Sequence, residues 1–270
     1  MIRRYVPHRP LSDDIHFFWA ANARQPHATE RVLPSGSPQL VVNLGEVPIR
    51  IRHRGPGSHC SSFDGGVLAG PYSEYILLEP APVPLMGVLF KPGGAFPFLA
   101  GVPVGELHNR HVALDSIWRT ANELRERLLE AETLHERFQV LEYFLDAMRT
   151  DDPPDAAIRH ALRVFRRVPL TRKMGDIAES LGMSSGKFIR TFQDRVGLTP
   201  KLHCRVRRFQ AALRFIGAEN RPAWSQLALE CGYYDQAHMI HDFKTFSGLA
   251  PTSYSALRGE HQNHVPVAGH

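Results

Sequence analysis

Apolar residues follow different spacings in the two halves of the chain. Before residue 113 they form short runs separated by proline- and glycine-rich turns, such as residues 33–36 and 54–57. Short runs rich in Val, Ile and Leu between such turns are typical of β-strands. The predicted strands are Gln39–Leu44, Ile49–His53, Val67–Ala69, Tyr75–Leu78 and Leu85–Phe90. This spacing predicts a small antiparallel barrel or sandwich, followed by a short helix near residues 94–99.

From residue 115 the apolar spacing changes to three and four, which predicts amphipathic helices. Asp115 is the expected N-cap of a helix that ends near residue 131. Thr133 and Glu136 form a capping box for a second helix that ends near Met148. The second helix carries an apolar stripe: Phe138, Leu141, Leu145 and Met148. Two interpretations stay open, in which the stripe only packs on the barrel or also forms a homodimer seam.

The last third of the chain contains the same pattern twice. Gly182 and Gly232 occupy equivalent places 50 residues apart (232 − 182), and Gly197 and Gly248 are 51 apart (248 − 197). Each copy reads as a short helix, a glycine-centred turn and a second helix, which is a helix-turn-helix unit. The expected helices are 155–168, 173–181, 184–196, 200–216, 223–231, 235–246 and 251–257. Helix 200–216 would span roughly 25 Å between the units.

These elements predict an α+β protein with a β-rich front half and an all-α rear half. Residues 151–154, Asp-Asp-Pro-Pro, interrupt any helix and mark the expected domain boundary. The predicted division is therefore a β-rich domain (1–114), a helical connector (115–150), a domain with two helix-turn-helix units (155–258) and a disordered tail (259–270).

The net charge of +5 is unevenly distributed along the chain. Residues 1–150 hold 15 Lys and Arg against 16 Asp and Glu, a net of −1, whereas residues 151–270 hold 17 against 11, a net of +6. A basic excess confined to the half with the repeat favours an anionic partner there, such as nucleic acid. Cys60, Cys204 and Cys231 form no C-x-x-C pair, which favours a reducing cytoplasm. With no apolar run of about 20 residues, no membrane span is expected.

The second copy of the repeat resembles the AraC-type transcription regulators. The resemblance rests on residues 232–239, Gly-Tyr-Tyr-Asp-Gln-Ala-His-Met, and on Phe243, Lys244, Phe246, Gly248, Pro251 and Tyr254. The first copy, from Ile177 to Pro200, is similar to the first unit of that family. The likeness covers about residues 157–258. It implies two helix-turn-helix units that enter successive major grooves of double-stranded DNA.

The front half is similar to the cupin-like domains that are often fused to this family. The motifs that carry this likeness lie at residues 31–36, 43–45, 69–71 and 90–95. The likeness implies a cupin-like barrel that serves as a sensor or dimerisation module. It does not identify what is sensed.

In AraC-type regulators the exposed side of each second helix reads bases. By position, the resemblance implies the base-reading residues Gly186, Ile189, Arg190, Gln236, Ala237, His238 and His241. Arg190 fits this role best, because a guanidinium pairs bidentately with guanine. Gln236 has an amide that suits adenine, or it helps to cap its helix. The family usually has Arg at the position of His241 and a polar or aromatic reader at the position of Gly186, so both positions depart from the pattern.

Phosphate contacts are expected from polar and basic side chains around the two units, although each is alternatively a solvated surface residue. These candidates are Ser184, Lys187, Lys201, Arg205 and Lys244. Metal binding and catalysis have little support. The pairs His108/His111 and His238/His241 have no third ligand beside them, and no His-x-His motif occurs. We expect no cofactor, no metal and no catalytic residue.

We therefore interpret the chain as a cytoplasmic, sequence-specific DNA-binding transcription regulator. The expected partners are double-stranded DNA, RNA polymerase, a small-molecule effector and a second copy of the chain in a homodimer. Two alternatives stay open: a cupin-type small-molecule enzyme fused to a DNA-binding anchor, and a purely architectural DNA-binding protein. The sequence does not name the effector or the operator, and it does not distinguish activation from repression.

Overall fold

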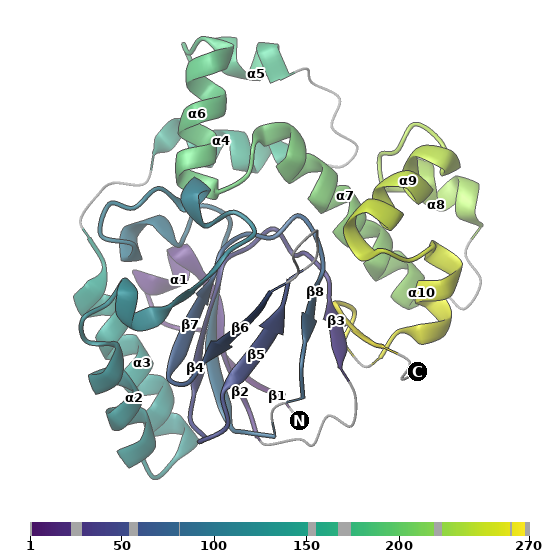
Figure 1. The fold of residues 1–270 in the computed structure, drawn as a ribbon. Helices are drawn as coiled ribbons and strands as arrows, with labels where there is room; N and C mark the ends of the chain where they lie inside the picture. The colour runs from purple at the N-terminus through teal and green to yellow at the C-terminus, as the bar shows by residue number, and fades with distance from the viewer. Residues whose placement is uncertain are drawn as a thin grey trace.

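The computed structural model describes residues 2–22, 29–53, 59–80, 82–150, 155–166, 174–218, 223–259 and 261–267. Its front half contains two antiparallel sheets that face each other (Figure 1). The six-stranded sheet has the order β1 (Ile2–Tyr5), β2 (Ile15–Ala21), β9 (Leu85–Phe90), β4 (Gln39–Asn43), β7 (Gly66–Ala69) and β10 (His111–Ala113). The five-stranded sheet has the order β11 (His264–Pro266), β3 (Glu30–Val32), β8 (Ile76–Leu78), β5 (Ile49–Arg52) and β6 (Cys60–Phe63).

The α+β fold class is confirmed, and each of the five predicted strands is present to within two residues at either end. The pattern did not reveal β1, β2, β3, β6, β10 and β11. Most of these are only three or four residues long, so alternation has too few positions to show. The short helix expected near residues 94–99 is a 3₁₀ turn, η1 (Phe96–Phe98). Two further short helices, α1 (Leu11–Asp14) and η2 (Val104–Leu107), lie in the front half.

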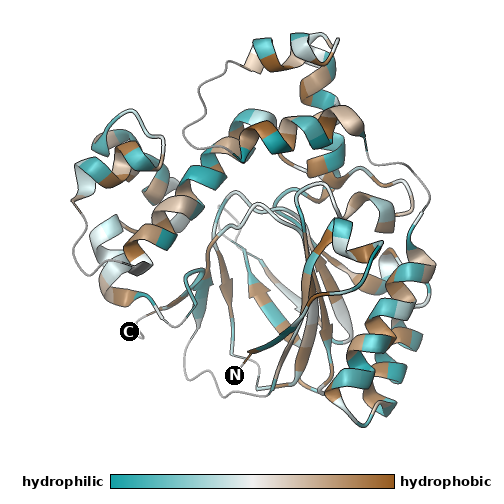
Figure 2. Ribbon diagram, turned by 180° about the vertical axis from the view of Figure 1, so that it is seen from behind, coloured by the Kyte–Doolittle hydropathy of each residue, from teal (hydrophilic) through white to brown (hydrophobic). Residues whose placement is uncertain are grey.

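The connector helices cover one face of the six-stranded sheet (Figure 1). They are α2 (Ala121–Glu130) and α3 (Leu134–Met148). Leu141 and Leu145 of α3 are fully buried, in one core with Phe18 of β2 and Val88 of β9. Figure 2 shows residues of both kinds, hydrophilic and hydrophobic, alternating along these two helices, as expected for helices that bury one face.

The apolar stripe of α3 is therefore used within the chain, which is the first of the two interpretations that the sequence left open. Phe138, Leu141 and Leu145 are 6%, 0% and 0% exposed, and Met148 packs against the same core. A side chain that is already buried cannot also face a second copy. The expected dimerisation residues Phe138, Leu141, Leu145 and Met148 are corrected accordingly, because the stripe belongs to the core of one chain.

The first connector helix starts later than the sequence predicts. Leu114–Ser116 form a 3₁₀ turn, η3, and the helix begins at Ala121 instead of just after Asp115. The buried Trp118 explains the difference, since its indole Nε1 donates to the carbonyl oxygen of Phe98 at 2.7 Å. That bond fixes the chain in a turn before the helix. The capping box at Thr133 and Glu136 is confirmed, with both reciprocal bonds present.

The rear half is helical and divides into two clusters around a long helix, α7 (Pro200–Ala218). The first cluster contains α4 (Ala156–Phe165), α5 (Met174–Ser180) and α6 (Ser185–Val196). The second contains α8 (Trp224–Glu230), α9 (Gln236–Ser247) and α10 (Pro251–Leu257). All seven predicted helices are found, with ends shifted by a few residues. The expected domain boundary at 151–154 and the end of the predicted helix 155–168 lie outside the described residues.

The C-terminal segment is ordered where the structure describes it, so the expected disordered tail is wrong for residues 261–267. Strand β11 pairs antiparallel with β3, with Val265 opposite Arg31. Val265 is 1% exposed and packs in the core of the second helical cluster, together with Leu33 of the front half. Within this strand only Val265 is a buried apolar residue, and one such residue gives no periodic pattern from which a strand could be predicted. In the described part of the chain, no helix combines the length and apolar character needed to cross a membrane.

Candidate nucleic-acid interface

Helices α5 and α6 form the first helix-turn-helix unit. Gly182, with φ +65°, supplies the left-handed residue that the turn between them requires. The Ser184 hydroxyl then accepts from the Lys187 backbone N–H at 3.3 Å and caps α6. Phe188 and Phe192 are buried against Phe165 of α4, which fixes the rotation of α6 about its axis. The opposite side of α6 consequently faces solvent.

The three predicted readers of the first unit lie together on that exposed side. Gly186, Ile189 and Arg190 are spaced at three and four, and all three are exposed. A side chain at Gly186 would meet open space, so backbone approach is unobstructed there. Ile189 is 42% exposed and is therefore accessible for an apolar contact to a partner. Lys187 is also exposed, on the first turn of α6.

Helices α8 and α9 repeat this arrangement in the second unit. Gly232 has φ +79° in the turn, and the Asp235 carboxylate accepts from the His238 backbone N–H at 2.7 Å at the start of α9. Met239, Phe243 and Phe246 are buried on one side of the helix.

The four predicted readers of the second unit differ in how free their side chains are. Ala237 and His241 are exposed. Gln236 is half-buried, and its Oε1 accepts from the Ser225 hydroxyl at 3.1 Å. His238 is half-buried and stands edge-on to the Tyr233 ring, with centroids 5.3 Å apart. The amide oxygen of Gln236 is thus already engaged within the unit, which leaves Ala237 and His241 as the more accessible pair.

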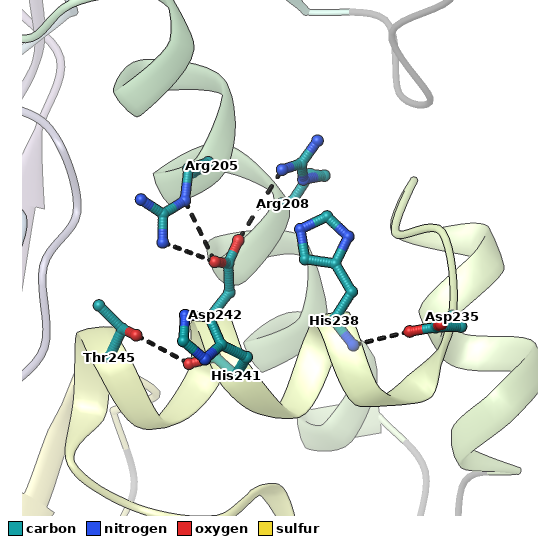
Figure 3. Close-up of polar contacts among 7 residues, drawn as sticks. All are labelled: Arg205, Arg208, Asp235, His238, His241, Asp242 and Thr245. Atoms are coloured by element: carbon teal, nitrogen blue, oxygen red, sulfur yellow. Dashed lines mark hydrogen bonds and ion pairs between the residues drawn. The ribbon is translucent and has the colours of Figure 1, made fainter.

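A buried carboxylate joins α9 to α7, and the sequence patterns did not single it out. Asp242 is 1% exposed, and its Oδ1 accepts from Arg205 Nε at 3.1 Å and Nη2 at 2.7 Å. Arg208 Nη2 lies 3.8 Å from the other carboxylate oxygen. Figure 3 shows both arginines reaching from α7 to this one side chain. The available signal was a charged residue on the apolar stripe of α9, three residues after Met239.

This ion pair changes the expectation for Arg205. As a phosphate ligand its guanidinium would point to solvent, but it is bound to Asp242 and stacks over the Phe246 ring at 5.2 Å. We therefore assign Arg205 to the junction between α7 and α9. The other basic candidates, Lys187, Lys201 and Lys244, are exposed, and Ser184 serves as a helix cap. Tyr234, 86% exposed in the turn before α9, is a further surface residue, to which the sequence analysis assigned no role of its own.

Both helical units contact the front half. At the first unit, Gly197 packs against Pro71 and Val104, and the Arg195 guanidinium lies 3.7 Å from the centre of the Phe96 ring. At the second, Arg31 Nη1 donates to the Ser247 carbonyl oxygen at 2.9 Å. Arg31 also lies over the ring of Tyr75, which packs on Gly248. The β-rich half therefore holds the C-terminal ends of both α6 and α9.

The front-half histidine pair noted in the sequence, His108 and His111, has other partners. His108 Nε2 is 2.8 Å from the Ser73 hydroxyl, and the His111 ring is hydrogen-bonded to the Tyr72 hydroxyl. Burial lowers the pKa of His111 to about 3 and raises the pKa of Tyr72, so both are neutral at pH 7. Among the residues that the structure describes, no three His, Cys, Asp or Glu side chains are grouped as metal ligands.

Comparison with known proteins identifies the repeat. A helix-turn-helix domain family matches residues 177–256, and a domain family of unknown function, DUF6597, matches residues 3–113. An uncharacterized HTH-type transcriptional regulator from Haemophilus influenzae is 35% identical over 78 residues, 29% of this chain. This match spans only 26%, about a quarter, of that relative's length.

The solved structure of ToxT from Vibrio cholerae has the same fold. It aligns with a TM-score of 0.50 at 9% identity, over 94% of this chain and 98% of ToxT. A transcriptional regulator with an AraC-type DNA-binding domain, from Chromobacterium violaceum, is 19% identical over 38% of this chain and 93% of its own, with a TM-score of 0.33. Together these similarities support an AraC-type regulator. The helix-turn-helix match runs from within α5 to α10, and the DUF6597 match covers the β-rich half.

Proposed function

We propose that the protein is a cytoplasmic, sequence-specific DNA-binding transcription regulator that places α6 and α9 in successive major grooves of one duplex. The observation that carries this proposal is that one continuous helix, α7, joins two helix-turn-helix units that each expose predicted readers: Gly186, Ile189 and Arg190 on α6, and Ala237 and His241 on α9. With 19 residues, α7 is about 28 Å long, close to the roughly 34 Å of one DNA turn. In this proposal Arg190 of α6 is the main residue that reads a specific base, since a guanidinium pairs bidentately with guanine.

In this proposal the front half senses an effector and controls how the two units are presented. The Arg31–Ser247 and Gly197–Pro71 contacts support this role, because a change in the β-rich half would reach both recognition helices. An effector that binds one arrangement of these contacts better would shift the population toward it. RNA polymerase is the proposed downstream partner. A homodimer also stays a proposal, which sedimentation of the full chain measures. We propose no catalytic role, because regulators of this family act by binding.

The proposal predicts salt-sensitive and sequence-specific binding of the full chain to duplex DNA. A binding site is first selected from a random duplex library, and affinity is then measured by fluorescence anisotropy at several salt concentrations. Affinity should fall steeply with salt, because Lys and Arg displace counterions from phosphates. Arg190→Ala should cost about 1–3 kcal/mol and relax base preference in one half of the site.

Arg110→Ala is the matched control, because Arg110 is an exposed arginine of the front half, far along the chain from either unit. It should leave affinity and base preference unchanged. Binding that does not respond to salt, or an unchanged base preference in Arg190→Ala, would contradict the proposal.

A further inference from the structure

A large cavity lies between the two sheets and extends to the helical half, which supplies part of its lining. Its volume is about 1970 Å³. The part between the sheets is mainly apolar, and its walls include Phe17, Trp19, Val41, Leu89, Val32 and Leu78. These side chains are only partly buried, although they point into the molecule. An apolar interior that the chain's own side chains leave unfilled is a typical small-molecule site.

The end of the cavity beside the helical half is strongly cationic. Among the described residues that line the cavity there are nine arginines and one lysine, against three aspartates and no glutamate. The aspartates have partners of their own: Asp14 binds Arg149 at 3.0 Å, Asp13 lies 3.8 Å from Arg9, and Asp155 caps α4. The cavity thus has an excess of positive charge that its own acidic residues do not neutralise.

Arg166 ends α4, Arg207 lies beside it on α7, and Arg214 lies about two turns further along α7; all three line the cavity. Arg207 Nη2 donates to the Arg166 carbonyl oxygen at 3.2 Å, which joins the two helices. Burial lowers the pKa of Arg207, and the neighbouring charges of Arg214 and Arg166 lower it further. Among the described residues none of the three has an acidic partner, and the buried Nε of Arg207 has no hydrogen-bond acceptor. Like charges held together in this way favour a bound anion.

A buried histidine adds a second unfilled hydrogen-bonding position. His203 lines the cavity one helical turn before Arg207 and is 2% exposed. Neither of its ring nitrogens has a partner, although it packs between Phe165 and Phe192 with centroids 6.1 and 5.6 Å away. A neutral imidazole always has one N–H donor, and leaving it unpaired inside a protein is costly. An oxygen-rich anionic ligand would satisfy both His203 and Arg207.

We propose that this cavity binds an amphipathic organic phosphate, with the phosphate held by Arg166, Arg207, Arg214 and His203 and the apolar part between the sheets. A phosphate fits better than a single carboxylate, because a phosphate monoester carries close to two charges and three acceptor oxygens near pH 7. Three guanidinium groups offer more charge and more donors than one carboxylate can use. The inference rests on the sensing role proposed above and names the chemical class of the effector.

Isothermal titration of the full chain without DNA tests the site, with octyl phosphate, octanoate, octanol and inorganic phosphate as probes. Octyl phosphate should bind at least about tenfold more tightly than octanoate, since it adds charge-assisted hydrogen bonds. Octanol and inorganic phosphate, which each lack one half of the ligand, should bind more weakly than octyl phosphate. Equal affinity for octyl phosphate and octanoate, or no binding of octyl phosphate, would overturn the proposal.

Two variants locate the site. Arg207→Gln should weaken octyl phosphate binding about tenfold or more, and Arg214→Gln, at an exposed position where folding is not at risk, should do likewise. Arg119→Gln is the control, since it removes the same charge from an exposed residue outside the cavity. An equal affinity of all three variants for octyl phosphate would overturn the assignment of the phosphate site to these arginines.

DNA binding is measured separately, so that the two proposals fail independently. If octyl phosphate binds as expected but no duplex does, the phosphate site stands and the regulator function fails. If duplex DNA binds and octyl phosphate does not, the regulator function stands and the phosphate site fails. If Arg207→Gln and Arg214→Gln weaken DNA binding in the absence of octyl phosphate, the arginines contact DNA and the assigned ligand is wrong.

Discussion

At the scale of single residues, Asp242 determines how the second recognition helix sits on the long helix. Its carboxylate is 1% exposed and faces Arg205 and Arg208, whose side chains are 29% and 24% exposed. A buried charge of this kind is destabilising unless it is paired, and each partner here comes from α7. The pair therefore fixes the register between α7 and α9, and with it the direction in which His241 and Ala237 point.

Asp242→Ala should lower the free energy of unfolding by roughly 2–3 kcal/mol, because it leaves two guanidinium groups without their common partner. Both guanidinium groups are partly exposed to water, so the loss should be at the low end of what breaking a buried ion pair costs. Urea unfolding followed by circular dichroism measures this loss. Asp194→Ala, at an exposed position of α6, is the matched control and should change stability little. A loss in Asp242→Ala no larger than in the control would show that the buried pair does not hold α9.

At the scale of secondary-structure elements, the C-terminal strand connects the two halves. Strand β11 adds to the five-stranded sheet beside β3, while Val265 packs in the core that surrounds α7 to α10. The Glu30 carboxylate is 2.7 Å from His264 Nδ1, and this hydrogen bond holds the pKa of Glu30 below its usual value. One three-residue strand thereby belongs to the sheet and to the helical core together.

Val265→Asp should detach this strand and reduce stability by about 2–4 kcal/mol, since it removes a buried apolar side chain and places a charge in its position. Hydrogen exchange should become faster at the β3 amides that pair with β11. Val47→Asp, at a residue that is 46% exposed, is the control and should leave both quantities nearly unchanged. Unaltered exchange in β3 would mean that β11 does not stabilise the junction.

At the scale of the whole molecule, burial of neutral histidines couples stability to pH. Burial lowers the pKa of His111 and His203 to about 3 and that of His261 to about 4. The unfolded chain titrates these groups near 6.5, so between that value and about 3 or 4 it binds more protons than the folded chain does. The folded state therefore loses no free energy of unfolding through these histidines above about pH 6.5. Below that value the free energy of unfolding decreases progressively as the pH falls.

His203→Phe should make stability less sensitive to pH, because it removes one of the groups that must stay neutral when buried. The free energy of unfolding is measured at pH 7 and pH 4.5 for the wild type and the variant, and the difference between the two pH values should be smaller in the variant. His135→Phe, at an exposed histidine, should keep the wild-type difference. An identical pH dependence in His203→Phe would show that His203 is not protonated on unfolding.

The sequence by itself determined the helical half of this protein. Glycine at fixed places, the caps Ser184 and Asp235, and apolar residues at a spacing of three and four are local signals. They act within one or two turns of helix, so the order and approximate ends of the helices follow without knowledge of the rest of the chain. The same locality explains why helical spacing alone is enough to place Gly186, Ile189 and Arg190 on one exposed side of α6.

Only the tertiary structure decided what depends on contacts between distant residues. Strand β11 forms because β3 offers it an edge, and α3 buries its stripe because the six-stranded sheet lies beneath it. Arg205 faces Asp242, 37 positions away, and Arg207 and His203 line a cavity whose other walls come from the front half. Burial and charge pairing of this kind depend on contacts between residues far apart in the sequence. The local spacing of residue types therefore does not predict them.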